Sequence, residues 1–198
     1  MKPLFPALAL LALCASPSVF AGGFDGPYVQ GLLGVNRGSL HDNLDGSKSG
    51  MRAVGQISAG STRTYGESEL FNLGVGFFYT AGRQSFTSAD SAGASARYTV
   101  KDAMGLTFEP GLNLGANALL YTKLGYVKAT VDARRSDAAG ASTSAGNGYD
   151  GIIYGLGAKV RLSETVYGVA EIQQYAFNKK EDVKPASLGA YVGVGYRF

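Results

Sequence analysis

The sequence contains a single cysteine, Cys14, and no tryptophan. Without a second cysteine the chain cannot form an internal disulfide. A lipid-modified cysteine would need a small residue before it, but Leu13 precedes Cys14. The chain also lacks a large excess of charge of either sign, because it has 18 lysines and arginines and 15 aspartates and glutamates. This near-neutral balance gives no indication of a nucleic-acid partner.

The first 21 residues have the features of a secretory signal peptide. Lys2 supplies a positive charge, Leu4–Leu13 is almost wholly apolar, and Val19-Phe20-Ala21 resembles a cleavage site. The apolar run has roughly ten residues, whereas a membrane-spanning helix needs about 20, which argues against a retained anchor. We therefore expect cleavage after Ala21, which also removes Cys14, and a single mature domain over residues 22–198.

After Gly22 the sequence lacks long apolar runs and lacks the i, i+3, i+4 apolar spacing of amphipathic helices. Apolar residues instead recur at every second position, in segments of about ten residues between turn-forming residues. The last segment, Ser187–Phe198, is the clearest. Its odd positions are glycine, polar or charged, whereas its even positions are Leu188, Ala190, Val192, Val194, Tyr196 and Phe198. This pattern predicts a strand with one wholly apolar face.

Seven further segments show the same alternation with varying clarity: Tyr28–Asn36, Met51–Ser61, Leu70–Thr80, Arg97–Pro110, Leu119–Val131, Gly148–Leu162 and Val166–Phe177. Eight such strands in an exported chain predict an all-β fold, an eight-stranded antiparallel up-and-down transmembrane β-barrel whose apolar face meets lipid. The 29 glycines fit this fold, because glycine relieves crowding on an inner barrel wall. Asp102, Lys128 and Gln174 fall on apolar faces, so each either lies near the membrane boundary or follows a bulge.

The connections between these strands alternate in length. Short turns are expected near Thr62–Glu67, Gly111–Asn117 and Ser163–Thr165, and long loops over Arg37–Gly50, Ala81–Ala96, Asp132–Asn147 and Asn178–Ala186. In outer-membrane barrels the short turns face the periplasm and the longer loops face outward. The sequence therefore predicts that both termini lie on the periplasmic side.

Loose strand motifs cover the mature chain: Gly26-Pro27-Tyr28-Val29, Glu109-Pro110-Gly111, Leu119–Tyr126, Gly155–Lys159, Glu171–Tyr175 and Gly193–Phe198. In these motifs the chain resembles the outer-membrane β-barrel domain family, the small eight-stranded barrels of the OmpA/OmpX type. The resemblance implies a location in the bacterial outer membrane, among lipid and lipopolysaccharide. It also implies that Tyr196 and Phe198 form the signal by which the barrel assembly machinery recognises its clients. It does not name a function.

The predicted barrel interior carries charge. An eight-stranded barrel is just wide enough for side chains to fill its interior, and the charged residues on the inward faces are Arg52, Glu109, Lys123, Lys159, Glu171 and Arg197. Because buried charges must be paired, we expect an internal salt-bridge cluster in which Glu171 bridges Lys159 and Arg197. Such a cluster either plugs the lumen or lines a narrow ion path, and the excess of cations would favour anions in that path.

The predicted outer loops carry the remaining functional signals. Mixed charges at Arg134–Asp137 and Lys179–Asp182 either stay solvated or contact lipopolysaccharide phosphates or host macromolecules. His41 and Asp90-Ser91 supply the residue types that lipid A palmitoyl transferases present in outer loops, but the aromatic framework and amphipathic helix of that family are missing. The sequence thus predicts a non-enzymatic protein with a structural and surface-interaction role and no catalytic, cofactor or metal residues. The alternatives are a narrow passive ion pore and, more distantly, a palmitoyl transferase-like enzyme.

Overall fold

The computed structural model describes residues 23–41, 51–66, 68–82, 84–89, 95–136, 142–178 and 184–198. They form the strand segments β1 (Gly26–His41), β2 (Met51–Tyr65), β3 (Phe71–Ala81), β4 (Gln84–Ala89), β5 (Ser95–Leu114), β6 (Ala118–Ser136), β7 (Ser142–Arg161), β8 (Val166–Phe177) and β9 (Lys184–Arg197). In this described part of the chain, no helix is long and apolar enough to cross a membrane. The expected signal peptide lies outside the described residues, so cleavage after Ala21 stays a prediction.

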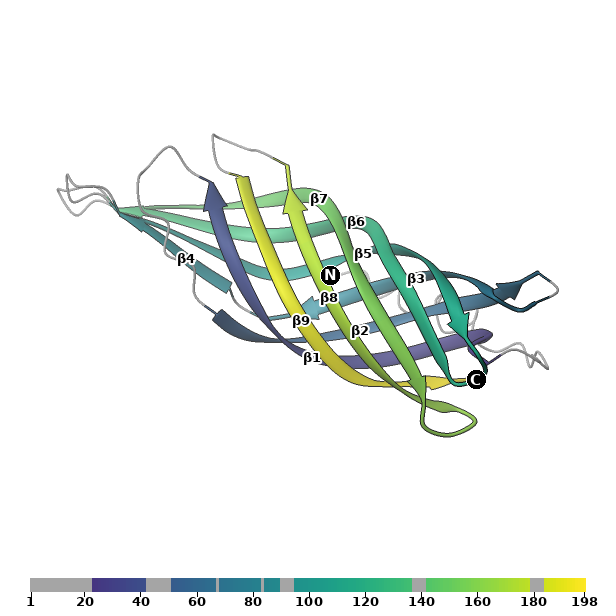
Figure 1. Ribbon diagram of the computed structural model, residues 1–198. Coiled ribbons are helices and arrows are strands. Elements are labelled where there is room, and N and C mark those ends of the chain that lie inside the picture. Colours follow the sequence, from purple (N-terminus) through teal and green to yellow (C-terminus); the bar gives the residue numbers. More distant parts are fainter. Residues whose placement is uncertain are drawn as a thin grey trace, which may run out of the picture.

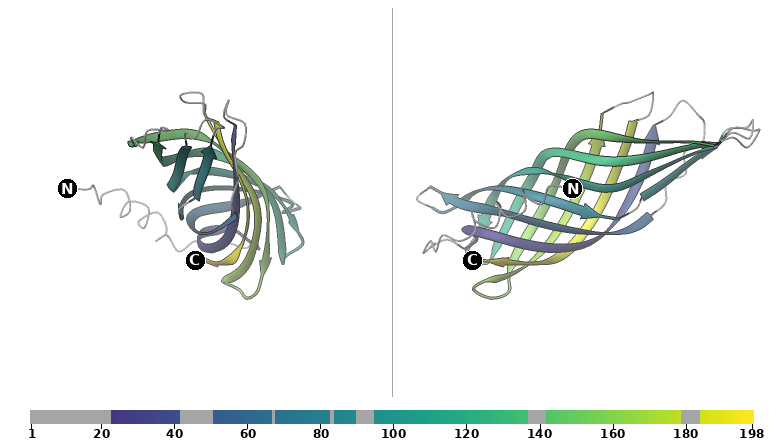
Figure 2. Two further views of the ribbon diagram at one scale, coloured as in Figure 1. Left: turned by 90° about the vertical axis from the view of Figure 1, so that its left-hand side faces the viewer. Right: turned by 180° about the vertical axis from the view of Figure 1, so that it is seen from behind.

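The strands close into one antiparallel barrel (Figures 1 and 2). β1 pairs with β2 and β9, and each strand from β9 back to β6 pairs with the strand before it. β3 pairs with both β2 and β5, which closes the ring. β4 continues the position of β3, since both pair with β5, so the barrel wall has eight strand positions. This confirms the predicted eight-stranded antiparallel barrel.

The short connections gather at the end of the barrel where the chain finishes (Figure 1). They follow β2, β5 and β7, near the three predicted short turns. The predicted long loops are partly wrong. β4 lies within the expected loop Ala81–Ala96, and β6 and β7 remain paired as far as Ser136 and Ser142, within the expected loop Asp132–Asn147. These Ala/Ser/Gly-rich stretches pair through their backbones without an apolar face, so they carry no alternating signal.

The extra pairing produces an extended sheet, which consists of β4 and the outer ends of β5, β6 and β7. These segments project well beyond the ends of β1, β8 and β9 at the loop end of the barrel (Figures 1 and 2). The sheet contains residues 84–89, 95–101, 130–136 and 142–148. A paired sheet, rather than loops alone, therefore rises from one side of the barrel mouth.

A β-bulge in β5 changes the face that its residues occupy. The pairing with β6 passes from Val100–Val131 to Ala103–Ala129, so Lys101 and Asp102 together oppose a single residue. Val100 consequently packs against an interior apolar cluster, whereas Lys101 forms a 2.6 Å ion pair with Asp132. The predicted orientation of Val100 toward lipid is wrong on this side of the bulge. The bulge also explains why Asp102 breaks the alternation.

The outer wall of the barrel is an apolar band with aromatic side chains at both borders. Phe71 and Tyr79 are both exposed and lie about 26 Å apart along β3. At the strand tilt of about 35–45° usual in outer-membrane barrels this spans roughly 20 Å of height, most of their apolar band of about 25 Å. On the outer face Tyr126 donates a 2.6 Å hydrogen bond to Asp150, and Lys128 lies 3.9 Å from the same carboxylate. The outward Lys128 therefore has a carboxylate partner on the neighbouring strand, and its position near the membrane boundary stays a prediction.

Inside the barrel, glycines let tyrosine rings cross from one strand to the next but one. Gly157 lies in register between Tyr121 and Glu171, and a Cβ atom on it would overlap the Tyr121 ring. Gly195 lies in the same way between Tyr167 and Gln30. In both rows the tyrosine hydroxyl hydrogen-bonds the polar residue beyond the glycine. The inward glycines therefore make room for specific cross-lumen contacts.

We predict that Gly157→Ala destabilises the barrel by about 1–3 kcal/mol, because its new methyl group occupies the space of the Tyr121 ring. Gly31→Ala is the matched control, since nothing lies within 4 Å of the position of its Cβ, and it should leave stability unchanged within about 0.5 kcal/mol. The measurement is the urea dependence of the folded fraction in detergent. Equal midpoints for the two variants would contradict the crowding described for the inner wall.

Candidate functional site

Four charged side chains from consecutive strands meet in the lumen. Glu109 comes from β5, Lys123 from β6, Lys159 from β7 and Glu171 from β8. Lys123 Nζ lies 2.6 Å from Glu171 Oε2 and 3.8 Å from Glu109 Oε1, and Lys159 Nζ lies 3.3 Å from Glu109 Oε2. The chain of contacts runs Glu171, Lys123, Glu109, Lys159. We refer to these four residues as the lumen charge cluster.

The lumen charge cluster is sealed from solvent and balanced in charge. Its residues are 1–3% exposed, and the neighbouring Gln173 is fully buried. Water would reach these side chains if they lined a hydrated channel. Two carboxylates face two ammonium groups, so every charge has a partner of opposite sign, which buried ions require. The geometry at this level is that of a plug.

Polar side chains donate further hydrogen bonds to both carboxylates of the cluster. Glu109 accepts hydrogen bonds of 3.3 Å from Tyr28 and from Thr107. Glu171 accepts from Tyr121 and Gln173, and at 3.5 Å from Gln30. These donors come from four strands around the ring, β1, β5, β6 and β8. Gln173 also donates to Gln56 of β2 at 3.1 Å. Removing a single carboxylate would therefore leave several buried donors without an acceptor.

The Lys159 ammonium group lies within a group of tyrosine rings. Its Nζ is 4.4 Å from the ring centroid of Tyr28, 4.7 Å from that of Tyr121 and 5.7 Å from that of Tyr167. Cations are attracted to aromatic faces within about 6 Å, and the attraction is stronger when water is absent. The tyrosines of the glycine rows thus stabilise a buried cation as well as supplying hydroxyl donors.

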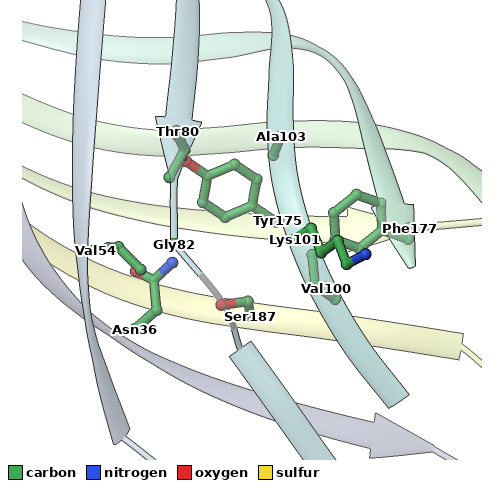
Figure 3. Close-up of a pocket in the computed structure, with 10 residues that line it drawn as sticks. All are labelled: Asn36, Val54, Thr80, Gly82, Val100, Lys101, Ala103, Tyr175, Phe177 and Ser187. Carbon is green, nitrogen blue, oxygen red and sulfur yellow. The ribbon is translucent and has the colours of Figure 1, made fainter. Parts of the chain in front are cut away.

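Above the charge cluster, toward the loop end, the lumen becomes mostly apolar. Tyr175 donates to Gln173 at 3.0 Å and lies 3.3 Å from the Thr80 hydroxyl across the barrel, and its ring packs edge-on against Phe78. A cavity of about 30 Å³ lies beside these residues, with Asn36, Val54 and Phe177 among its lining residues (Figure 3). That volume holds about one or two water molecules, so it is too small to form a path by itself.

At the turn end the start of the described chain is held inside the barrel mouth. We call residues 23–25 the amino-terminal anchor. The Gly23 carbonyl accepts hydrogen bonds from Arg161 at 2.9 Å and from Arg197 at 3.1 Å. Phe24 is buried and packs edge-on against Tyr167, and the Asp25 carboxylate accepts from Thr64. The anchor therefore fills the mouth opposite the extended sheet.

The structure brings together four of the six predicted interior charges and places two elsewhere. Arg52 is exposed near the loop end of β2, and Arg197 is partly exposed at the turn end, where it binds the Gly23 and Glu164 carbonyls. The predicted bridge from Glu171 to Lys159 and Arg197 is wrong. Glu171 pairs across β8 and β9 with Tyr191, about 20 Å along the strand from Arg197. Alternation gives the face of a residue but not its height in the barrel, which depends on strand register.

Sequence reasoning missed the hydrogen-bonding partners of the cluster. Gln30, Gln56 and Gln173 are buried, although glutamine is usually exposed. A usable signal was present, because each of these glutamines occupies an inward position of its strand. Tyr28 was noted only as an aromatic residue near the mature amino terminus. The residues of the enzyme hypothesis remain untested, since Asp90 and Ser91 lie outside the described residues and only the backbone of His41 is described.

Comparison with known proteins identifies a family and several solved structures with a similar fold. The model of the family described as outer membrane protein beta-barrel domain matches residues 5–198. No curated protein sequence matches the chain. Neisserial surface protein A is similar in structure, with 18% identity, a TM-score of 0.53, and coverage of 87% of this chain and 97% of that one.

Two other solved structures are informative. Ail, the attachment invasion locus protein of Yersinia pestis, was crystallised with the heparin analogue sucrose octasulfate; it has 18% identity and a TM-score of 0.50, with coverage of 87% and 99%. The outer membrane protease OmpT of Escherichia coli has 10% identity and a TM-score of 0.52, with coverage of 92% and 100%. At these identities the likeness concerns the fold alone.

We predict that Glu171→Gln lowers the free energy of unfolding by about 3–5 kcal/mol, because it leaves the Lys123 ammonium group buried beside an uncharged amide. Glu164→Gln, in the exposed bend between β7 and β8, should change it by less than about 0.5 kcal/mol. Because the chain has no tryptophan, urea unfolding is followed by the gel mobility of unboiled samples and by circular dichroism.

A double-mutant cycle with Lys123→Met tests the pairing itself. The double variant should be destabilised by clearly less than the sum of the two single variants, since both charges then leave the lumen together. Additive effects of the two substitutions would show that the 2.6 Å contact between these side chains does not contribute to stability.

Proposed function

The chain belongs to the outer membrane protein beta-barrel domain family and is located in the bacterial outer membrane, and from this premise we propose that it is a closed, non-enzymatic barrel that presents an interaction surface outside the cell. The observation that carries the proposal is the combination of a filled lumen with a long paired sheet at the loop end. The barrel supplies a rigid support, and the extended sheet with its adjoining segments supplies the surface.

The filled lumen favours this role over a passive ion pore. The lumen charge cluster is buried, and Gln56, Gln173 and Tyr175 continue the packed contacts toward the loop end. An ion that entered would have to break the Lys123–Glu171 pair without water to replace it, which is costly in a low-dielectric interior. The pore stays the second candidate. Opening it would require concerted movement of the two lysines.

The extended sheet favours a surface-interaction role. Surface elements on a rigid scaffold commonly carry binding residues, and here the outer ends of β5, β6 and β7 project beyond the ends of β1, β8 and β9 (Figure 1). Ail shows that a barrel of this fold can hold a sulfated ligand. For this chain, lipopolysaccharide and host or other surface ligands are the proposed partners.

We propose that the protein is not an enzyme. Within the described ranges, no group of three or more His, Cys, Asp or Glu residues could hold a metal ion. The fold alone does not decide the question, because OmpT is a protease on a similar barrel. The proposal rests on the chemistry of the lumen, where both carboxylates are committed to lysine partners and are closed to any substrate.

Biogenesis is proposed to follow the outer-membrane route. Residues 1–21 would direct export and be removed, and the last strand would then be presented to the barrel assembly machinery. Tyr196 and Phe198 lie on the outward face, are about half exposed, and stack edge-on with ring centroids 5.1 Å apart. This exposed aromatic pair at the end of β9 is the proposed assembly signal.

The lumen proposal is tested with the purified protein in planar lipid bilayers. We expect no discrete conductance steps, because the lumen charge cluster closes the barrel at its middle. Glu171→Gln is the informative variant, since a loosened plug should give rare openings where the unaltered chain gives none. Regular single-channel steps from the unaltered protein would replace the closed-scaffold proposal with the pore.

Deletion of Phe198 should slow insertion into the outer membrane severalfold, because the terminal aromatic residue is removed from the strand that the assembly machinery would recognise. Pulse-chase labelling followed by the mobility shift of unboiled samples measures the rate. Leu162→Ala, which removes an exposed apolar side chain in the bend after β7, is the control. Identical insertion rates for all three proteins would remove Phe198 from the assembly signal.

A further inference from the structure

We propose that a depression on the outer wall, over Pro110, binds a lysophospholipid, a lipid with one acyl chain and a free hydroxyl group on its glycerol. This inference goes beyond the closed-scaffold proposal and does not depend on it. It starts from a proline inside a strand of a closed barrel. Proline has no N–H to donate and is normally confined to sheet edges and bulges, whereas β5, which contains Pro110, has a neighbouring strand on each side.

The missing N–H interrupts the pairing of β5 with β6. The register of these strands is unchanged on either side of the gap, but the rows of Glu109 and Pro110 are not paired. The pairing of β3 with β5, by contrast, runs without a gap through Leu73 and Pro110. The N–H that proline lacks would therefore have pointed toward β6, where the opposite residue in the same register is Thr122. The Thr122 carbonyl group is left without its ladder donor.

The loss of this donor is costly because of where Thr122 lies. Its neighbours in the chain, Tyr121 and Lys123, are buried in the lumen, so the Thr122 side chain is on the outward face. Lipid chains supply no hydrogen-bond donors to a barrel wall, and a polar group that loses its partner there needs another one. Thr122 thus presents a carbonyl oxygen and a hydroxyl group to the membrane.

The outer wall is hollowed at the same place. A depression of about 300 Å³ lies over the gap. Its lining residues include Phe71, Pro110, Leu112, Leu120, Thr122 and Leu156. All of these side chains except that of Thr122 are apolar. Ligand sites typically combine apolar walls with a small number of placed polar groups, so the depression suits an acyl chain that carries one hydrogen-bonding group.

The height of the gap selects the part of the lipid that reaches it. Phe71 lies at the turn-end border of the apolar band, and Pro110 stands opposite Leu73, two residues further along β3. That separation is about 7 Å along the strand, or roughly 5 Å of height at the usual strand tilt. At this depth the hydrocarbon region gives way to the interfacial layer, which contains the glycerol groups of the lipids. Short turns of outer-membrane barrels face the periplasm, so the leaflet is the inner one, which consists of phospholipids.

The unpaired carbonyl group distinguishes between phospholipids. In a diacyl phospholipid both glycerol oxygens that carry the chains are esterified, and they can only accept hydrogen bonds. A lysophospholipid keeps one free hydroxyl group at that level. This hydroxyl group can donate to the Thr122 carbonyl oxygen while the single chain lies in the depression. The site therefore favours the lysophospholipid over its diacyl parent.

The test uses the protein purified from outer membranes in detergent, titrated with lysophosphatidylethanolamine or with diacyl phosphatidylethanolamine of the same chain length. Native mass spectrometry gives the affinity for each lipid. We expect the lysolipid to bind about tenfold more tightly, the effect of one hydrogen bond. Pro110→Ala restores the N–H opposite Thr122, so the preference should fall below about twofold. Pro27→Ala is the matched control, since Pro27 also lies within a strand but its row is paired with Ser61, and the preference should remain.

A lysophospholipid whose glycerol hydroxyl group is methylated separates hydrogen bonding from the number of chains. It should bind the unaltered protein as weakly as the diacyl lipid does. Equal binding of the free and methylated forms would show selection by shape alone and would overturn the proposal. An unchanged preference in Pro110→Ala, or no preference in the unaltered protein, would overturn it as well. Thr122→Val keeps the carbonyl group and should keep the preference, whereas its loss would overturn the role of the carbonyl. Unboiled gel mobility verifies that each variant is folded.

Discussion

The pairing of Lys123 with Glu171 is the contact on which the interior of this barrel depends. It places an ammonium group and a carboxylate 2.6 Å apart in a space that water does not reach, and every neighbouring polar group is arranged around it. Tyr121 and Gln30 donate hydrogen bonds to the Glu171 carboxylate. The second pair, Lys159 and Glu109, continues the network toward β5. A buried pair of this kind is not in itself a large source of stability. It does fix one arrangement of the surrounding strands, because any shift in register would separate the charges.

The two faces of the barrel wall follow opposite physical requirements. The outer face needs apolar side chains, because lipid offers no hydrogen-bonding partner, and it meets that need with leucine, valine, isoleucine and aromatic residues. The inner face needs dense packing in a narrow cylinder. Glycine and tyrosine meet it together, since a glycine between two strands lets a tyrosine ring lie flat across it and reach an acceptor beyond. The high glycine content is therefore a property of the lumen as much as of the turns.

Sequence reasoning reached the architecture because alternation is a strong signal where a strand separates lipid from a packed interior. It identified Glu109, Lys123, Lys159 and Glu171 as inward charges, and the structure shows them together. It could not identify the partner of Glu171, since register along the barrel is not encoded in the period of any one strand. It also missed β4, whose residues Gln84–Ala89 have no apolar face. It misassigned Val100, because a β-bulge leaves no trace in composition.

The amino-terminal anchor joins the two ends of the chain. Arg197 reaches Gly23 over a sequence separation of 174 residues, and Arg161 reaches it over 138. The first and last strands, β1 and β9, pair with each other, and the amino-terminal anchor thus adds side-chain contacts between the first and last described segments. Contacts of such long range form late, because most of the loop-closure entropy must be lost before they are gained. In folding, the contacts of Gly23 with Arg161 and Arg197 are therefore expected to form after the strands have paired into a closed barrel. Once formed, they oppose separation of the first and last strands.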